Sequence, residues 1–307
     1  MSGVRVGLDI GGTKIHGVLL DAAGTVLAEH RQATVVGPEG VVTGAVEAVA
    51  ALRAAATEAP LEGVGIGVPG VVDPGSGSVR YAMNLGLGAR PFALAEAVGG
   101  RLEGVRVQVE NDLNATALGA TAILEGVGDD LAYLALGTGV AAGLVLDGRL
   151  RRGRFGLAGE VGHLPVDPEG LECPCGQRGC LELYASGSGL ARQFPYEGSE
   201  PIAKVVFEAA ERGEQLAVEV RDRLLDGVAE MVQMLVLTLD VGSVVLGGGI
   251  VRLGDALLEG VRSRLEQREG ASPFLAASGL ARRVRLAPAE APVGAVGAAL
   301  TLERGEP

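Results

Sequence analysis

Two segments of this chain repeat one pattern: an apolar strand, a turn of glycine and threonine, and a second apolar strand. The first reads VRVGLDI, GGT and KIHGVLLD from residue 4, and the second reads LAYLALGTGVAAGLVLD from residue 131. Both second strands end in similar words, GVLLDAAG and GLVLDGR. The repeat indicates a duplicated α/β fold with a cleft between two halves. The alternative is chance, since glycine-rich hairpins are common in a chain with 50 glycines.

The rest of the chain alternates helical and strand patterns without a proline- or serine-rich linker. A loop or short hairpin is expected at 71–84, where turn residues dominate. Further strands are expected at 24–33, 64–68, 105–109, 243–250 and 283–288, and helices at 39–58, 91–98, 182–193, 201–212, 215–239, 255–268 and 293–302. We predict a smaller domain over 1–110 joined by the C-terminal helix at about 290–307, and a larger domain over 111–289.

Composition excludes several classes of protein. With 48% hydrophobic and 21% charged residues, the chain has the balance of a well-cored soluble protein. The net charge of −12 disfavours nucleic acid and anionic membranes as partners, because no broad basic face is available. The N-terminus lacks a signal-peptide pattern, and every later apolar run is interrupted before it reaches membrane-spanning length. We therefore expect a cytoplasmic enzyme.

Three glycine turns follow apolar strands and are candidates for binding phosphate. A glycine turn lets backbone N–H groups approach phosphate oxygens, a threonine hydroxyl adds a donor, and a nearby aspartate can hold a metal ion through water. The spacing fits neither a Walker loop nor a dinucleotide fingerprint. The candidate nucleotide-binding residues are Asp9, Gly11, Gly12, Thr13, Lys14, Gly137, Thr138, Gly139, Gly247, Gly248 and Gly249.

The word ENDLNA places Asn111 and Asp112 where a strand runs into a helix. Ligands in α/β folds bind at the carboxyl ends of strands, and an aspartate there is suited to accept a proton from a substrate hydroxyl. The alternative is that Asp112 or Asn111 only caps the helix or a turn. Two of the chain's three asparagines fall in this word, which favours the catalytic interpretation of Asp112.

All three cysteines, Cys173, Cys175 and Cys180, lie within eight positions and begin ten residues after His163. An odd number of thiols in a reducing compartment does not form a simple disulfide framework. Three thiolates and one imidazole form the Cys₃His set that tetrahedral zinc accepts, and four protein ligands indicate a structural metal. The alternative is three reduced thiols in a surface turn; a redox role is weaker because no CxxC is present.

Seven short sequence motifs, in one order along nearly the whole chain, resemble those of the ROK family (repressors, open reading frames and sugar kinases). They are LDIGGTK, GVPGVVD, ENDLNATALGA, GTGVAAGLVLDGRL, GEVGH, CPCGQRGCLE and VVLGGGI. The word CLELYASGSGLAR is closer to the bacterial glucokinases of the family than to its other sugar kinases. The resemblance implies an actin-like, hexokinase-type (ribonuclease H-like) two-domain fold, with the zinc-binding loop in the larger domain.

The resemblance also implies ATP as phosphoryl donor, Mg²⁺, a structural Zn²⁺ and a homodimer or homotetramer. Asp112 would be the general base for the 6-hydroxyl of the sugar, and Asp9 would orient magnesium. His163 would serve twice, with one ring nitrogen on zinc and the other toward the sugar. The implied sugar contacts are Asn84, Asn111, Asp112, Glu160, His163 and Glu182.

Other functions stay open at this point. A kinase of the same family for N-acetylmannosamine, mannose or fructose would share these motifs, and a sugar-binding protein without catalysis would share the fold. Polyphosphate as donor would favour a basic groove, which the acidic balance argues against. A ROK repressor is not expected, because the first predicted strand begins near Val4 and leaves no room for a preceding helix-turn-helix. A chaperone-type ATPase would lack the zinc loop.

Overall fold

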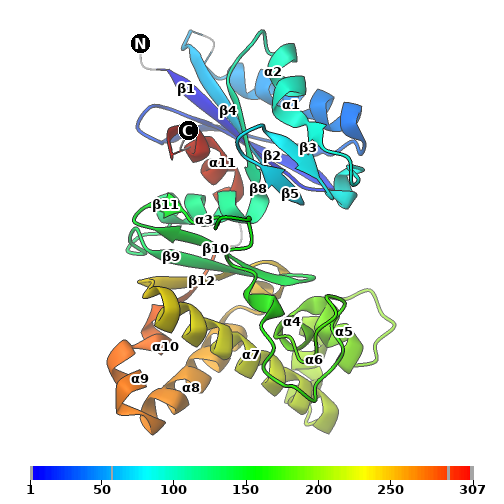
Figure 1. Cartoon of the computed structure of the whole chain (residues 1–307), viewed down its shortest axis with the longest axis vertical. Coiled ribbons are helices and arrows are strands. Elements are labelled where there is room, and N and C mark those ends of the chain that lie inside the picture. Colours follow the sequence, from blue (N-terminus) through cyan, green and yellow to red (C-terminus); the bar gives the residue numbers. More distant parts are fainter. Residues whose placement is uncertain (1–2, 57, 289–290, 305–307) are drawn as a thin grey trace. The chain divides into compact units, whose positions relative to one another are not determined.

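The structure is a computed structural model that describes residues 3–56, 58–288 and 291–304 (Figure 1). The chain divides into two compact units, each with its own core. Of the described residues, the first unit contains those up to 125, 148–150 and those from 291. The second unit contains residues 126–147 and 151–288.

The first unit is built on a five-stranded sheet in the order β3-β2-β1-β4-β8. β1 (Val4–Ile10) pairs antiparallel with β2 (Lys14–Leu20) and parallel with β4 (Leu61–Val68). β4 pairs parallel with β8 (Val107–Asn111), and β3 (Val26–Ala33) forms the other edge. The carboxyl ends of β1, β4 and β8 therefore meet at one edge of the sheet, where ligands bind in α/β folds.

Helices cover both faces of this sheet. α1 (Pro38–Arg53) and α2 (Leu94–Arg101) pack on one face, whereas α3 (Asp112–Ile123) and α11 (Val293–Arg304) belong to a separate cluster on the other. α11 approaches β1 so closely that a Cβ at Gly7 would lie 1.9 Å from a helix carbonyl oxygen. A larger residue at Gly7 would therefore push α11 off the sheet.

A small three-stranded sheet follows β4. It consists of β5 (Val71–Asp73), β6 (Ser78–Arg80) and β7 (Phe92–Ala93), in sequential order. The β5–β6 pair is the short hairpin expected at 71–84. A 3-10 turn, η1 (Met83–Leu85), then carries Asn84.

The sheet of the second unit repeats the pairing pattern of the first. β9 (Leu131–Leu136) pairs antiparallel with β10 (Val140–Leu146) and parallel with β12 (Ser243–Gly247), which pairs parallel with β13 (Val284–Leu286). The contact clustering groups the short strand β11 (Arg149–Leu150) with the first unit. An antiparallel hairpin joined to a parallel strand thus occurs in both units, and the duplication expected from the sequence is confirmed.

Helices make up most of the second unit, and the long helix α7 is central to its core. Its apolar face packs on α4, α6 and α8. The elements are η2 (Val161–His163), α4 (Glu182–Ala185), α5 (Gly187–Gln193), α6 (Ile202–Glu211), α7 (Gln215–Leu239), η3 (Gly249–Leu253), α8 (Asp255–Ala271), α9 (Pro273–Ser278) and α10 (Leu280–Arg283).

Two features differ from the sequence expectation. The helix expected over 182–193 is broken at Ser186, whose extended backbone lets its Oγ accept a hydrogen bond from Gly189 N (2.9 Å) and begin α5. A serine destabilises the fold less at the cap of a second helix than in the interior of one helix, because inside a helix its hydroxyl competes for the backbone hydrogen bonds. The first segment of the first unit ends at Glu125, beyond the expected boundary at Glu110, because α3 packs against α11.

Candidate active site and metal centre

Asp112 is the first residue of α3 and directly follows β8. The cap is Asn111, not Asp112, because the Asn111 Oδ1 accepts hydrogen bonds from Leu113 N (3.0 Å) and Asn114 N (3.2 Å). The Asn111 side-chain amide also donates to Gly70 O (3.2 Å). Capping accounts for the Asn111 oxygen, and the Asp112 Oδ1 accepts from the same Leu113 N (2.8 Å).

The buried carboxylate of Glu110, which the sequence places with Asn111 and Asp112 at the end of the strand, supports this strand-to-helix junction, a role that the sequence did not indicate. Glu110 is only 1% exposed, and its Oε1 accepts from Asn111 N (3.0 Å) and from Asn114 Nδ2 (2.9 Å). The Thr116 hydroxyl adds a bond to the carbonyl of Asp112 (2.7 Å). In the sequence, the spacing of four residues between the glutamate and the second asparagine of ENDLN could have indicated this side-chain hydrogen bond. Together these bonds fix the backbone on both sides of Asp112.

Asp9 and Asp112 are carboxyl groups whose pKa values are both raised. Burial, followed by the negative charge of Asp112, raises the pKa of Asp9 to about 6, although Lys14 opposes the shift. Burial also raises the pKa of Asp112, against hydrogen bonds from the backbone N–H of Leu113 and of Asp112 itself. Two poorly solvated carboxylates at one sheet edge suit a proton acceptor beside a site for a hydrated cation.

The first Gly-Thr turn, Gly11–Thr13 (turn 1), joins β1 to β2. Gly11 N donates to Lys14 O (3.0 Å), and the exposed Lys14 begins β2. Asn84 packs against this turn, because a Cβ at Gly12 would lie 2.8 Å from the Asn84 Cβ. The structure therefore brings Asn84, Asp9 and Asp112 into the same region of the first unit as turn 1.

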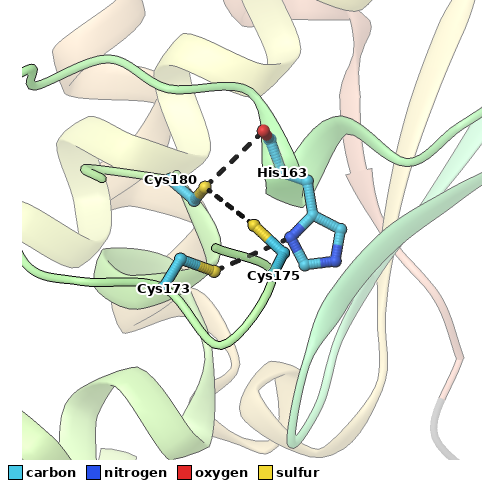
Figure 2. Close-up of side chains that lie close together, drawn as sticks. All are labelled: His163, Cys173, Cys175 and Cys180. Atoms are coloured by element: carbon cyan, nitrogen blue, oxygen red, sulfur yellow. Dashed lines mark hydrogen bonds between the residues drawn. The ribbon is translucent and has the colours of Figure 1, made fainter. Parts of the chain in front are cut away.

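The three cysteines and His163 converge in the second unit (Figure 2). All four potential ligand atoms lie within 4.8 Å of one another. Cys175 Sγ lies 3.7 Å from Cys180 Sγ, and Cys173 Sγ lies 3.9 Å from His163 Nδ1. Zn–S bonds of about 2.3 Å at tetrahedral angles place two sulfurs about 3.8 Å apart. The cluster therefore fits a tetrahedral Cys₃His zinc site, with His163 Nδ1 as its nitrogen ligand.

The thiols of this cluster differ in acidity. Hydrogen bonding from Gln177 lowers the pKa of the exposed Cys175 to about 6, whereas burial raises the pKa of Cys180 to about 12. The Gln177 amide also donates to His163 O (2.9 Å), so one side chain links the cysteine loop to the histidine segment. Cys175 is thus more ready than Cys180 to supply the thiolate that a metal requires.

The candidate sugar contacts of the second unit lie next to the second Gly-Thr turn, Gly137–Gly139 (turn 2). Glu182 Oε2 accepts from Val140 N (2.8 Å), and a Cβ at Gly139 would lie 2.6 Å from this oxygen. A Cβ at Gly162 would lie 2.3 Å from Val140 O and 3.3 Å from the Glu182 Cβ. The segment from Glu160 to His163 therefore passes beside Glu182 at the end of turn 2.

The third glycine run begins at Gly247, the last residue of β12, and continues beyond the strand. Gly248 has φ +85°, and a Cβ there would lie 2.5 Å from Leu136 O, so the position requires glycine. Gly247 lies under the Tyr133 hydroxyl, 2.0 Å from the place of a Cβ. The run therefore lies against β9, the strand that leads into turn 2.

An open hollow of about 670 Å³ lies elsewhere in the second unit, beside the cysteine loop. It is lined by residues of the 167–172 loop and by polar residues of α4, α5 and α7. None of the candidate catalytic, sugar-contact or metal-ligating residues lines it, so this hollow does not mark the candidate active site.

The comparisons with known proteins agree with these features. The model of the ROK family matches residues 5–304. A glucokinase of Streptomyces coelicolor is 34% identical over 279 residues, which cover 85% of this chain and 86% of that protein. An N-acetylmannosamine kinase of Yersinia pseudotuberculosis is 30% identical over 248 residues, or 81% of this chain and 83% of that protein.

Solved structures also match over the full length. A ROK hexokinase from Thermus thermophilus is 33% identical, with a TM-score of 0.80 and coverage of 98% of both chains. A ROK glucokinase from Streptomyces griseus, solved with glucose and AMPPNP, is 34% identical, with a TM-score of 0.69 and coverage of 97% of this chain and 98% of that one. The expected hexokinase-type fold is confirmed. Of the helices in the described ranges, none is both long and apolar enough to cross a membrane.

Proposed function

Because this chain belongs to the ROK family and is an ATP-dependent sugar kinase, we propose that its acceptor is glucose, phosphorylated at the 6-hydroxyl. The observation that carries the proposal is the placement of Asp112. It is a poorly solvated carboxylate with a raised pKa, at the first turn of α3, with its backbone fixed by its neighbours. Its position fits a general base that acts on a hydroxyl.

In the proposed reaction, Asp112 accepts the proton of the 6-hydroxyl as that oxygen attacks the γ-phosphorus of ATP. A new P–O bond forms to the sugar, the bond between the γ-phosphorus and the β,γ-bridging oxygen breaks, and ADP leaves. The raised pKa of Asp112 strengthens it as a proton acceptor. The rest of the rate enhancement comes from positioning and charge neutralisation, which dominate phosphoryl transfer.

The proposed sugar contacts are Asn84, Asn111 and Asp112 in the first unit and Glu160, His163 and Glu182 in the second. Carboxylates suit this role because each accepts hydrogen bonds from two hydroxyl groups. A sugar that lacks one of these hydroxyls would leave a carboxylate unpaired, which is how such sites discriminate. Glu182 has one oxygen bonded to Val140 N and a second oxygen for this purpose. Asn111 has one amide hydrogen left after its bond to Gly70 O.

For the donor, we propose that turn 1, turn 2 and Gly247–Gly249 bind ATP, with Lys14 on a phosphate. Asp9 would hold the hydrated Mg²⁺ that neutralises phosphate charge. The partly buried Asp9 fits this role, because a nearby cation would offset the burial that now raises its pKa.

We propose zinc as the metal of the Cys₃His cluster, held by His163 Nδ1 and the three thiolates. When bound, it supplies rigidity and no chemistry, because four protein ligands complete its shell. Ligation through Nδ1 leaves the other ring nitrogen of His163 for a sugar hydroxyl and fixes its tautomer. The homodimer or homotetramer implied by the family resemblance stays a prediction, to be checked by light scattering.

A coupled ADP-release assay with Mg·ATP tests the acceptor. Glucose, N-acetylmannosamine, mannose and fructose would be compared, with a no-sugar control. We expect the highest kcat/KM with glucose. The second candidate is N-acetylmannosamine, favoured by the Yersinia relative; a preference for it would retain the fold and base but overturn the acceptor. If no sugar stimulates ADP release, the non-catalytic binding protein is the better description.

A further inference from the structure

The two Gly-Thr turns are held in the same manner by residues that no motif assigned. In turn 1, Thr34 donates its backbone N–H to Thr13 O (3.1 Å) and its hydroxyl to Gly11 O (2.7 Å). In turn 2, Ser188 donates its backbone N–H (3.2 Å) and its hydroxyl (2.7 Å) to Thr138 O. Each turn therefore has carbonyl oxygens bonded by both donors of one hydroxyl residue.

The remaining carbonyl oxygens of turn 2 are also occupied. Gly187 N donates to Gly137 O (2.8 Å), and Gly137 N donates to Gly139 O (3.0 Å). All three carbonyl oxygens of turn 2 thus have protein donors, supplied by the start of α5 and by the turn itself. A phosphate bound at this turn would therefore not face a carbonyl oxygen that lacks a hydrogen-bond donor.

In contrast to the carbonyl oxygens, four backbone N–H groups of the two turns have no hydrogen-bond acceptor within the described residues. Within the described residues, no hydrogen bond is made by the backbone N–H of Gly12 or Thr13 in turn 1. The same holds for Thr138 and Gly139 in turn 2, again within the described ranges. Consecutive N–H groups of this kind form an anion-binding concavity, provided that the turn keeps its conformation.

We propose that Thr34 and Ser188 are positioning residues for the phosphate groups of ATP. Thr34 holds two carbonyl oxygens of turn 1 and Ser188 holds the central carbonyl oxygen of turn 2, so that two adjacent N–H groups of each turn stay available for phosphate oxygens. Neither side chain is required to touch ATP. This inference rests on the proposed function, because it takes the two turns as the phosphate-binding elements.

The test replaces each hydroxyl and measures binding by calorimetry. Thr34→Val removes the hydroxyl bond to Gly11 O. Ser188→Ala removes the hydroxyl bond to Thr138 O together with the bond to the Ser186 hydroxyl (3.1 Å). Both variants keep the backbone N–H bond to the turn. Since one such bond changes an equilibrium by roughly three- to tenfold, we expect the Kd for Mg·ATP to rise by that factor. The Kd values for adenosine and glucose should stay unchanged. Ser188→Thr and Thr34→Ser restore a hydroxyl and should recover most of the ATP affinity.

Matched controls are available in both units. Ser199 is exposed like Ser188, and Thr25 lies just before β3 whereas Thr34 lies just after it; no hydrogen bond of either control hydroxyl occurs in the described residues. Ser199→Ala and Thr25→Val should leave ATP affinity unchanged. An unchanged Kd for ATP in the folded Ser188 and Thr34 variants would overturn the inference, as would an equal loss of adenosine and ATP affinity. Wild-type protein that does not bind ATP would instead overturn the proposed function.

Discussion

In both turn 1 and turn 2, carbonyl oxygens accept hydrogen bonds from a threonine or serine outside the turn. The charged groups around the two turns differ. Asp9 precedes turn 1 and Lys14 follows it, and Asp112 raises the pKa of Asp9. Turn 2 lies between Leu136 and Val140 instead, and its nearby carboxylate, Glu182, is engaged with the Val140 N–H. Turn 1 is thus surrounded by charges suited to a cation and a proton, whereas turn 2 is a neutral backbone element.

The anchors of the two turns differ as well. Thr34 stands at the end of the edge strand β3, so turn 1 is held by the sheet to which it belongs. Turn 2 is held by the start of α5 and by Glu182, which follows Cys180 by only two residues. The two turns therefore have different supports: turn 1 is held by its own sheet, and turn 2 is held by the segment that follows the cysteine loop.

The largest effect on turnover should come from Asp112→Asn, which removes the proposed base from the first unit, where turn 1 lies. Because a general base contributes about 10²- to 10⁴-fold, kcat should fall by that factor while the Kd for glucose changes little. Steady-state kinetics and calorimetry measure the two quantities. Asp129→Asn, at an exposed position, is the control. Near-normal turnover in Asp112→Asn would remove Asp112 from the role of base.

Loss of the metal should disturb the unit that contains turn 2. Purified protein should carry about one zinc per chain, and Cys175→Ser should lose both the metal and several degrees of Tm, because metal binding is coupled to folding. Elemental analysis and thermal unfolding test this. Cys175 is exposed, so its sulfur contributes little to core packing. A metal-free wild-type protein with an unchanged Tm would contradict the prediction.

The pH dependence of stability should report on Asp9 beside turn 1. Its pKa of about 6 in the folded chain exceeds the ordinary aspartate value of 3.8, so the folded state binds the proton more tightly. Stability should therefore be lowest above pH 6 and should increase as the pH falls from about 6 to about 4. Asp9→Asn should be more stable than wild type at pH 8, by about 2–3 kcal/mol, with the difference vanishing near pH 4. If urea unfolding gave the same dependence of the unfolding free energy on pH for wild type and Asp9→Asn, that result would contradict a raised pKa of Asp9.

The smallest effects should come from adding one methyl group to each turn. Gly12→Ala would meet Asn84 at 2.8 Å and Gly139→Ala would meet Glu182 at 2.6 Å, so each should cost about 1–3 kcal/mol of unfolding free energy. The paired controls are Gly11→Ala and Gly137→Ala, whose nearest neighbours lie at 3.6 and 3.9 Å. Equal losses in all four variants would mean that close packing is not the reason for glycine at these turns.

Local patterns predicted much of this molecule. The helix at 215–239 was placed at its observed bounds, because its apolar spacing spans 25 residues. The cysteine spacing predicted the metal cluster, because four ligands close in sequence can meet without a distant partner. The broken helix at Ser186 was missed, because a serine hydroxyl can cap a new helix or remain inside one, and only its bond to Gly189 N distinguishes the two.

The sequence by itself determined the duplicated strand–turn–strand units, the residues of the Cys₃His cluster and the family to which the chain belongs, because these depend on residue types at short, fixed spacings. Tertiary structure decided what holds the two turns and Asp112 in place. Thr34 lies 21 residues beyond Thr13, and Ser188 lies 50 residues beyond Thr138. Pairings at such separations arise only when strands and helices pack, because no local pattern specifies which hydroxyl will reach a distant carbonyl.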